Sequence, residues 1–496
     1  MNVNPITRLD YPDPDVIRVE DTYYMVSTTM HFMPGCEILQ SFDLVHWEHA
    51  TYVYETLDHT DAQQLKSGQN IYGQGMWAAS LRYHEGRFYI CFVANDTRKT
   101  YLYTSEKIDG PWKKQLIEGF YHDGSLLFDE DGRNYIVYGN DEIWITELNE
   151  DLTAPKKDGL HRLLVSDHKN PELGYEGSHI QKINGYYYIF LIHSLRDRWM
   201  RTEACFYSDS LEGEFTGGDV LCDDRGYCGQ GVAQGGIVDT PDGKWYAMLF
   251  QDSGAVGRLP ILLPVTWKDH FPVFGQNGHV PEEIEVHSTR PGYIYQPLVG
   301  SDDFCNGLLP RWQFNHDPDP RYYHLDALQG TYTITTREVC TELTQAVNTL
   351  TQRMSYPSCA AEVTVDASAL KEGDVAGLCA FQGCYAAVGI TKHHGKYEVL
   401  MLDKKEDGIL DMTEGTVVES HQMDFRLEAD FCNMKDEARC YYRVNKGDWL
   451  PIGTVHKLYF KLDHFTGCRF GLFCYAAEET GGSACFRDFK YYDVDE

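Results

Sequence analysis

The stretch Asn184-Gly185-Tyr186-Tyr187-Tyr188-Ile189 joins a tight turn to a run of aromatic and β-branched residues. Asn-Gly and acidic-Gly pairs before such a run are strong signals for a β-hairpin. The pattern occurs five times, at residues 20–25, 85–90, 131–136, 184–189 and 242–247. Its repeated tyrosines, at 24, 89, 135, 188 and 246, are 65, 46, 53 and 58 residues apart. Five such units predict a five-bladed β-propeller rather than a β-sandwich, because a sandwich need not repeat one hairpin five times.

A second position recurs twelve residues before each repeated tyrosine. Trp77, Asp123, Glu176 and Gln234 occupy it in four copies, and in the first copy it falls on Pro12, next to Asp13. This position belongs to the strand nearest the propeller axis, so we expect these side chains to converge on one axial pocket. Three carboxylates in one cleft repel each other, and the pKa of one of them should therefore rise.

Paired carboxyl groups are the groups that typically hydrolyse glycosidic bonds. One must be protonated to donate to the leaving oxygen, and the other must be ionised to activate water or to attack. Asp13 and Glu176 offer such a pair. An ionised Asp123 beside Glu176 would raise the pKa of the glutamate and suit it to the acid role. Each residue alone is a weak signal, since Pro12-Asp13-Pro14 is also an ordinary turn; their shared position in the repeat strengthens it.

The sequence changes character near residue 290. We expect a propeller at residues 1–290, a linker at 291–300 and a second domain at 301–496. Short alternating runs such as Gly330–Thr335 predict that the second domain is a β-sandwich of the jelly-roll kind. No long amphipathic helix is indicated, so the expected fold class is all-β.

The composition argues against several partners. The net charge of −32 repels nucleic-acid phosphates and anionic lipid headgroups. No apolar stretch reaches the roughly 18 residues of a membrane span. The first sixteen residues lack the features of a secretory signal, so a complete chain is expected to be cytoplasmic. The fifteen cysteines are expected to be reduced thiols. A small neutral oligosaccharide remains the expected partner, and the oligomeric state is not indicated.

Several runs of the sequence resemble glycoside hydrolase family 43 in order and spacing. They are YPDPD (11–15), GMWAASLRYHEGRFYI (75–90), YHDGSLLFDEDGR (121–133), YEGSHIQKINGYYYIF (175–190) and DTPDGKWYAMLFQDSGAVGR (239–258). The runs at 301–316 and 471–493 are similar to the ends of the concanavalin-like sandwich that is often attached to β-xylosidase and arabinofuranosidase members. The resemblance therefore covers nearly the whole chain.

The resemblance implies a role for each carboxylate. Asp13 would be the general base, Glu176 the general acid and Asp123 the modulator that tunes and orients Glu176. The family looks inverting, which implies that the carboxyl groups of Asp13 and Glu176 lie roughly 6.5–9.5 Å apart.

The resemblance also implies residues that bind the sugar. Trp77 is similar to a tryptophan that walls the sugar pocket, and Arg258 to an arginine that contacts sugar hydroxyls. Phe32 is expected to add an apolar wall. Ordinary core packing is the alternative for the two aromatic residues, and a structural ion pair is the alternative for Arg258.

The fifth blade departs from the family pattern. Many members carry an axial histidine there, sometimes with a bound calcium, whereas this chain offers Gln234 and has no histidine close by. Gln234 is expected to line the pocket. The departure puts a metal in doubt, so we expect no catalytic metal and no required cofactor, and a structural calcium in the propeller channel is left open.

Together these features predict an inverting exo-glycosidase. It would remove terminal α-L-arabinofuranosyl or β-D-xylosyl residues, or both, from arabinoxylan or xylo-oligosaccharides. One alternative is a five-bladed glycosidase for another sugar, such as a fructan or sucrose hydrolase. Another is a catalytically inactive propeller that only binds sugar, and a third makes the C-terminal domain a true carbohydrate-binding module.

Overall fold

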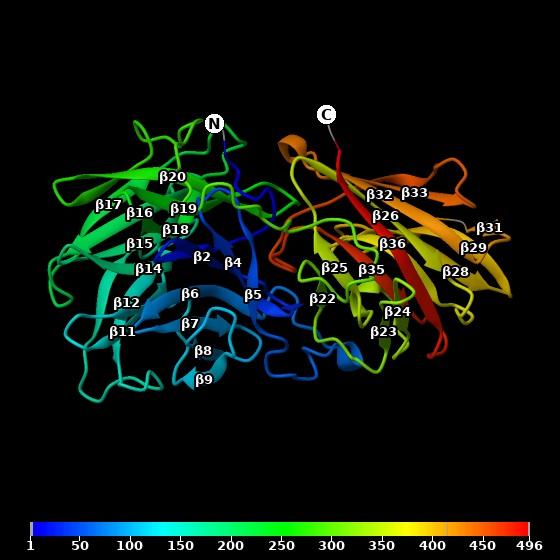
Figure 1. Ribbon diagram of the computed structural model, residues 1–496, viewed down its shortest axis with the longest axis horizontal. Helices are drawn as coiled ribbons and strands as arrows, with labels where there is room; N and C mark the ends of the chain where they lie inside the picture. The colour runs from blue at the N-terminus through cyan, green and yellow to red at the C-terminus, as the bar shows by residue number, and fades with distance from the viewer. Residues whose placement is uncertain (1–2, 414, 495–496) are drawn as a thin grey trace.

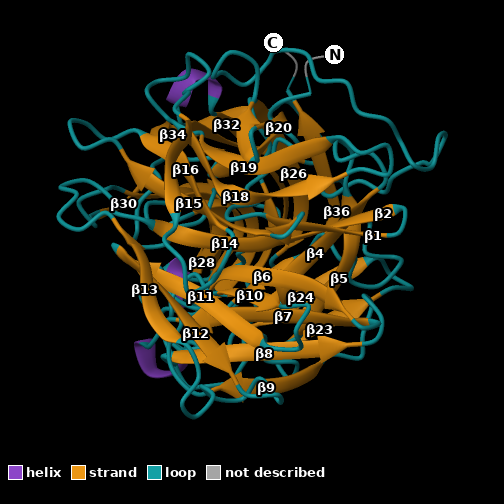
Figure 2. Cartoon of the chain, turned by 90° about the vertical axis from the view of Figure 1, so that its left-hand side faces the viewer, coloured by secondary structure: helices purple, strands orange, loops and turns teal. Residues whose placement is uncertain are grey.

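The computed structural model of the protein describes residues 3–413 and 415–494. Two all-β bodies lie side by side, one coloured blue to green and the other yellow to red (Figure 1). The first body is a five-bladed propeller and the second a sandwich of two sheets, so the predicted fold class is confirmed. Short 3-10 turns are the only helices in the part of the chain that the structure describes (Figure 2). None of the helices described is long and apolar enough to cross a membrane.

Five antiparallel sheets, each of four strands in sequence order from the axis outward, form the blades. They are β1 (Asp15–Val19), β2 (Thr22–Ser27), β4 (Gly35–Ser41) and β5 (Glu48–Tyr54); β6 (Met76–His84), β7 (Arg87–Ala94), β8 (Lys99–Ser105) and β9 (Lys113–Ile117); β10 (Ser125–Phe128), β11 (Asn134–Asn140), β12 (Glu142–Leu148) and β13 (His161–Ser166); β14 (Glu176–Ile183), β15 (Tyr186–Ser194), β16 (Arg201–Ser208) and β17 (Thr216–Leu221); and β18 (Val232–Asp239), β19 (Trp245–Asp252), β20 (Arg258–Lys268) and β21 (Phe271–Phe274).

Each repeated hairpin joins the first two strands of a blade. In the fourth blade Ile183 pairs with Tyr186 across the turn. The two turn residues, Asn184 and Gly185, have φ values of 51° and 85°. Asn and Gly tolerate this left-handed backbone best, which is why the pair marks a two-residue hairpin.

The first strands of three blades share an irregularity. Their pairing shifts between Trp77 and Ser80, between Glu176 and His179, and between Ala233 and Gly236. In the other two blades the first strand begins just after Asp13 and Asp123. Bulges of this kind re-aim a side chain out of the regular ladder. The position singled out by the repeat therefore lies close to the start of the first strand in every blade.

The N-terminal segment closes the propeller ring against the fifth blade. Asn4 Nδ2 donates to the Leu262 carbonyl (2.7 Å), and the Asn4 side-chain oxygen accepts from the Leu262 amide (2.8 Å). Further along, the Tyr11 amide donates to the Arg258 carbonyl (3.1 Å). This pairing sets the segment that carries Asp13 beside the start of β20.

The C-terminal body packs two sheets around the largest apolar cluster of the molecule. One sheet contains, in order, β22 (Gln313–Asn315), β25 (Leu350–Arg353), β35 (Arg469–Tyr475), β27 (Val375–Phe381), β28 (Ala386–His393), β29 (Lys396–Lys404) and β30 (Leu410–Met412), with β31 (Thr416–Val418) also on β29. The other contains β23 (Tyr323–Asp326), β24 (Thr331–Thr335), β36 (Ser483–Asp493), β26 (Ser358–Asp366), β32 (Gln422–Asp430), β33 (Glu437–Val444) and β34 (Leu450–Lys457).

Backbone hydrogen bonds add one short strand of the propeller chain to the edge of a sandwich sheet. The two-residue strand β3 (Phe32–Met33) leaves the first blade between β2 and β4 and pairs with β22. The chain between the last blade strand and β22, which includes the predicted linker, runs along the first blade. There the Thr289 amide donates to the Phe42 carbonyl (2.7 Å).

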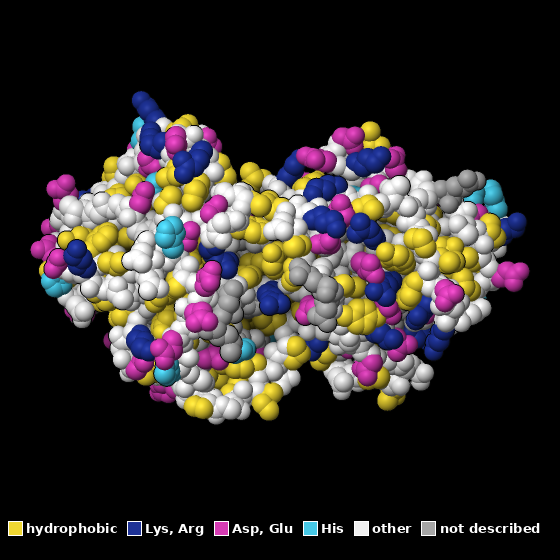
Figure 3. Space-filling view, turned by 90° about the horizontal axis from the view of Figure 1, so that it is seen from above, with side chains coloured by type: hydrophobic (Ala, Val, Ile, Leu, Met, Phe, Trp, Pro, Cys, Tyr) yellow, Lys and Arg dark blue, Asp and Glu magenta, His cyan; other side chains and the backbone are white. Residues whose placement is uncertain are grey.

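A buried polar network strengthens the same interface. Arg353 of the sandwich donates to Glu37 Oε2 (2.8 Å) and to the Asp10 carbonyl (2.9 Å) of the propeller. Asp10 in turn accepts from the amides of Gly467 (2.7 Å) and Arg258 (2.8 Å). A sandwich loop, residues 458–467, is thereby held against the start of β20. On the face seen from above, acidic and basic side chains are interspersed over both bodies (Figure 3).

Candidate active site

The carboxyl groups of Asp123 and Glu176 both lie close to the imidazole of His122. His122 Nε2 lies 3.5 Å from Asp123 Oδ2 and 3.6 Å from Glu176 Oε2. Asp123 Oδ2 also accepts a hydrogen bond from the Gly177 amide (3.0 Å). The Asp123 carboxylate therefore holds the backbone immediately after Glu176, while the Glu176 side chain itself is 21% exposed.

The surroundings of this group shift two pKa values. Burial raises the pKa of Asp123 to about 6; the His122 charge opposes this shift, and the charges of Glu176 and Asp13 add to it. The charge of Asp123, helped by Glu176, raises the pKa of His122 to about 9 against the effect of burial. His122 is therefore a cation between two acidic groups at neutral pH. A raised carboxyl pKa in this cleft was expected, and Asp123 carries one.

Asp13 is held on both of its oxygens. Its Oδ1 accepts from Arg258 Nη1 (3.1 Å) and its Oδ2 from Thr28 Oγ1 (2.6 Å). Asp13 and Asp123 have φ values of 52° and 48°. Non-glycine residues adopt this left-handed backbone rarely, and such strain gathers at functional sites. The fold thus keeps both aspartates in backbone positions that ordinary packing does not favour.

Aromatic rings from both bodies wall the site. The Trp77 ring lies 6.1 Å from the His122 ring and 5.5 Å from the Phe465 ring, between centroids. The Arg258 guanidinium lies over the Phe465 ring, 4.2 Å from its centroid. Phe465 belongs to the sandwich loop 458–467, so the second domain supplies part of the wall.

Gln234 lies behind the Glu176 segment. A Cβ on Gly177, whose φ is +65°, would come within 2.7 Å of Gln234 Cδ. Only glycine fits this backbone and this space. The backbone N–H of Gln234 donates to Glu203 Oε2 (2.7 Å). Gln234 therefore supports the residue after Glu176, and its contact with sugar stays a prediction.

The structure corrects the expectation for Phe32. Its side chain is 0% exposed in an apolar cluster made mostly of sandwich residues, among them Phe381 and Phe473. The Arg469 guanidinium covers its ring at 3.5 Å. A ring without exposed surface cannot wall a sugar pocket. Its strand is drawn into the sandwich sheet by pairing with β22, which sequence periodicity did not indicate.

Four residues of the site were not singled out from the sequence. His122 directly precedes Asp123 in a quoted motif, and its position was the one available signal. Asn140 donates to Glu176 Oε2 (2.6 Å) from the end of β11. Thr28 and Phe465 reach the site through tertiary contacts, and nothing local in the sequence marks them.

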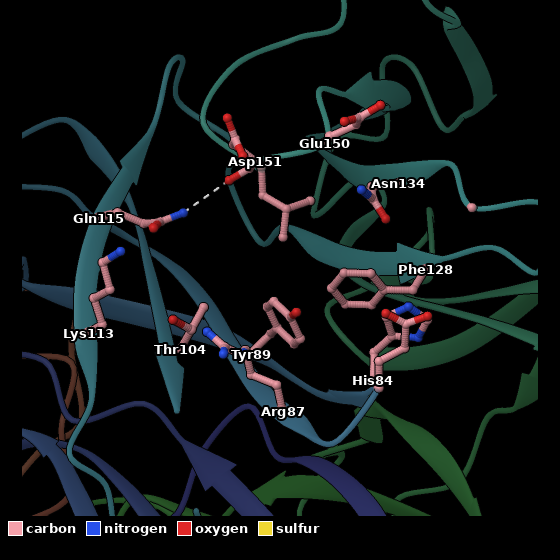
Figure 4. A pocket seen from close by; sticks show the side chains of 13 residues that line it. His84, Arg87, Tyr89, Thr104, Lys113, Gln115, Phe128, Asn134, Glu150 and Asp151 are labelled. Atoms are coloured by element: carbon pink, nitrogen blue, oxygen red, sulfur yellow. Dashed lines mark hydrogen bonds between the residues drawn. The ribbon is translucent and has the colours of Figure 1, made fainter. Parts of the chain in front are cut away.

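A separate pocket lies at the hairpin end of blades 2 and 3 (Figure 4). It has a volume of about 380 Å³. The rings of His84 and Phe128 stack there at 4.6 Å, and Tyr89 packs against Phe128. None of Asp13, Asp123 and Glu176 lines it. We therefore place the candidate active site where the three carboxylates converge, and not in this pocket.

Comparison with protein families fits this geometry. The model for glycosyl hydrolases family 43 matches residues 3–272. The chain belongs to this family. A second model, the β-xylosidase C-terminal concanavalin A-like domain, matches residues 301–492. The match over the propeller covers the blade strands from β1 to β20, the start of β21 and all three carboxylates.

Characterised relatives of this family 43 member are distant. A β-xylosidase of Formosa agariphila is 26% identical over 99% of this chain and 89% of its own length. A xylosidase/arabinosidase of Butyrivibrio fibrisolvens is 24% identical over 99% of both chains. A non-reducing end α-L-arabinofuranosidase of Bacteroides ovatus is 24% identical over 83% of this chain and 79% of its own length.

Solved structures share the whole fold. A protein of Bacteroides eggerthii described as a bifunctional GH43-CE protein is 42% identical, with a TM-score of 0.93 over 99% of this chain. This chain spans 64% of that protein's length. An engineered family 43 enzyme with endo-xylanase and exo-arabinofuranosidase activity is 27% identical, with a TM-score of 0.86 over 99% of both chains.

Proposed function

We propose that this family 43 protein is an inverting exo-glycosidase that removes terminal α-L-arabinofuranosyl or β-D-xylosyl residues, or both, from arabinoxylan or xylo-oligosaccharides. The observation that carries the proposal is the gathering of Asp13, Asp123 and Glu176 at equivalent blade positions beneath an aromatic wall. The named activities of the distant relatives, β-xylosidase and arabinofuranosidase, favour a pentose over other sugars.

Hydrolysis by inversion would use two of the carboxyl groups directly. Asp13 takes a proton from a water molecule whose oxygen attacks the anomeric carbon. Glu176 gives its proton to the leaving oxygen as the glycosidic bond breaks. Water thus supplies the new hydroxyl group, and each carboxyl changes its protonation once. Both then return to their starting states by exchange with solvent.

Asp123 would act through Glu176. Its hydrogen bond from the Gly177 amide fixes the backbone that carries the acid. Asn140, at the end of β11 in the third blade, donates to the Glu176 carboxyl group. Hydrogen bonds therefore hold both the side chain of the acid and the backbone beside it. Positioning of this kind contributes to catalysis because it orients the proton donor before the reaction.

We expect hydrolysis at the ends of the sugar chain, because the sandwich domain closes one side of the site. Phe465 lies between Trp77 and Arg258 and narrows the site on one side. A pocket closed on one side accepts a terminal sugar, whereas a long chain would need an open groove. Release of internal fragments from linear xylan before single pentoses would contradict the exo assignment.

The test compares the wild type with Glu176→Gln and Asp13→Asn on nitrophenyl α-L-arabinofuranoside and nitrophenyl β-D-xyloside. We expect the wild type to release nitrophenol and both variants to lose most activity. Glu172→Gln, an exposed glutamate four residues from Glu176, is the matched control and should keep full activity. Proton NMR of the first sugar formed should show the inverted anomer.

Two outcomes would overturn the proposal. No release from either pentoside, with release from fructosides or other sugars, would assign a different glycosidase. No hydrolysis of any glycoside, together with binding of xylo-oligosaccharides, would identify an inactive sugar-binding propeller. If the wild type is active, the ratio of the two rates identifies the preferred sugar.

A further inference from the structure

One arginine links four blades in the axial channel. The channel, about 420 Å³, is lined by the first strands of all five blades. Arg82 on β6 donates to Asp15 Oδ2 (2.8 Å) of the first blade and to Ser125 Oγ (2.7 Å) of the third. It also donates to the Leu126 carbonyl (2.8 Å) of the third blade and the Ile180 carbonyl (3.2 Å) of the fourth. Its side chain is therefore anchored by blades 1, 3 and 4 while belonging to blade 2.

Asp15 completes this network at the centre of the propeller. It is buried, and its Oδ2 also accepts from the Leu81 amide (2.7 Å). Its Oδ1 lies 3.1 Å from His179 Nδ1 of the fourth blade. Although burial works against it, the Arg82 guanidinium and then His179 hold the pKa of Asp15 below its ordinary value. Asp15 is therefore a charged partner of Arg82 inside the channel.

The network sits directly beside the catalytic positions along the chain. Asp15 is two residues after Asp13, and Ser125 is two residues after Asp123. His179 is three residues after Glu176. A shift of any network member would therefore move the backbone that carries one of the three carboxylates. Arg82 contacts none of the three itself in the contacts described above.

The channel does not suit the calcium ion that a family 43 propeller sometimes holds. Ca²⁺ takes six to eight oxygen ligands at about 2.3–2.6 Å. Both oxygens of Asp15 are already engaged, and the Arg82 guanidinium brings a positive charge that would repel the ion. The Gln181 amide nitrogen is committed to the Ile237 carbonyl at 2.8 Å. The polar atoms of these residues already bind one another, so they are not available as ligands for a calcium ion.

Outside the channel, the described residues include one group of side chains that are close enough together to bind a metal ion. His122, Asp123 and Glu176 place their ligand atoms within 4.8 Å of one another. This grouping is the active site itself, and an imidazole is a poor ligand for Ca²⁺. It offers no structural cation site in the channel.

We propose that the Arg82 guanidinium takes the place of a bound cation in this propeller: it ties the blades together at the axis and so positions Asp13, Asp123 and Glu176 without a divalent metal. Arg82 is a positioning residue. The inference goes beyond the proposed function, because it does not depend on which glycoside is hydrolysed.

The first experiment removes divalent cations from the wild-type protein with EDTA. The melting temperature and kcat are then measured with and without added CaCl₂. We expect both to stay unchanged in every condition. A fall in either value after EDTA treatment, reversed by Ca²⁺, would overturn the proposal. The melting temperature gives a result even if the protein hydrolyses neither pentoside, so this arm is separate from the proposed function.

The second experiment replaces the guanidinium. Arg82→Ala is expected to lower kcat about 10- to 100-fold, because a small displacement of the catalytic groups can cost about 100-fold in rate, with a smaller change in KM. Guanidinium ion, added at concentrations that do not lower the wild-type melting temperature, should restore part of the lost activity. If Arg82→Ala does not fold, Arg82→Lys is measured instead, and its kcat should fall because one ammonium cannot reach all the partners.

Arg18→Ala is the matched control. Arg18 lines the same channel and pairs with Asp239, which joins blades 1 and 5 away from the carboxylates. We expect this variant to keep wild-type kcat. Equal losses in the Arg18 and Arg82 variants would mean general loosening of the blades and would overturn the specific role of Arg82. Wild-type kcat in the Arg82 variants would overturn it as well.

Discussion

His122 sets the charge balance of the active site at the scale of a single residue. Burial and the neighbouring carboxylates raise the pKa of Asp123, and the charge of the His122 imidazolium limits this rise to about 6. Replacing it with the uncharged His122→Asn should therefore raise the Asp123 pKa. Asp123 would then be protonated at higher pH and would no longer be the charged acceptor for the Gly177 amide. We expect the acidic limb of the kcat/KM pH profile to move to higher pH.

A second histidine provides the control for that profile. His84 stacks on Phe128 in the pocket at the hairpin end of the blades, away from the carboxylates. His84→Asn should leave the acidic limb where the wild type has it. An unmoved acidic limb in His122→Asn would show that the imidazolium does not tune Asp123.

Gly177 allows a second prediction at the residue scale. Gly177→Ala would place a methyl group 2.7 Å from Gln234 Cδ in a backbone with φ near +65°. We expect the free energy of unfolding to fall by about 1–3 kcal/mol and kcat to drop, since the same backbone carries Glu176. Denaturant unfolding and steady-state kinetics measure the two effects.

A companion variant separates the two causes. Adding Gln234→Ala to Gly177→Ala should recover only part of the stability, because it removes the collision but not the backbone strain. Full recovery would contradict a role for the left-handed backbone.

At the scale of an element, the sandwich loop 458–467 forms part of the wall of the candidate active site. Phe465 is half-buried and packs between Trp77 and Arg258. Phe465→Ala should lower kcat/KM on the better pentoside about tenfold or more, because it removes a wall that orients the sugar. The melting temperature should change little. Leu462→Ala, on the same loop and 69% exposed, is the control and should keep wild-type kinetics. Equal kinetics in the two variants would contradict a role for the Phe465 ring.

At the scale of the whole molecule, buried histidines make the domain interface sensitive to acid. His31, His316 and His464 pack together with Tyr72, whose ring stacks on His464 at 3.9 Å. Burial lowers the pKa of all three. The unfolded chain takes up protons on these residues below about pH 6.5, where the folded chain does not. The contribution of these three histidines to the free energy of unfolding is therefore complete above that pH and declines as the pH falls below it.

The measurement is the melting temperature as a function of pH. We expect it to fall between about pH 6.5 and pH 5, and His464→Gln should reduce the slope. His46→Gln, whose side chain is 65% exposed on the first blade, should leave the slope unchanged. An equal slope in the wild type and in His464→Gln would contradict the interpretation, because other titrating groups act alike in both proteins.

The sequence predicted what repeats locally and missed what depends on distant contacts. The five hairpins were predicted because each is specified by a few adjacent turn and strand residues. The convergence of Asp123 and Glu176 followed from their equal place in the repeat. Phe32 was assigned wrongly because its strand pairs with β22, and Phe465 was missed because it comes from the other domain. The raised pKa of Asp123 depends on burial, which the sequence does not state.

The pairing of β3 with β22 has a consequence for how the protein is made. The strand that pairs with β3 is synthesised about 280 residues after it. At about 5–20 residues per second, a ribosome needs tens of seconds to deliver it. During that time the Phe32 side chain lacks the sandwich residues that bury it in the folded protein, although the blade hairpins are already able to form. Slow translation of the second half of the message would lengthen this exposure and should therefore lower the yield of soluble protein.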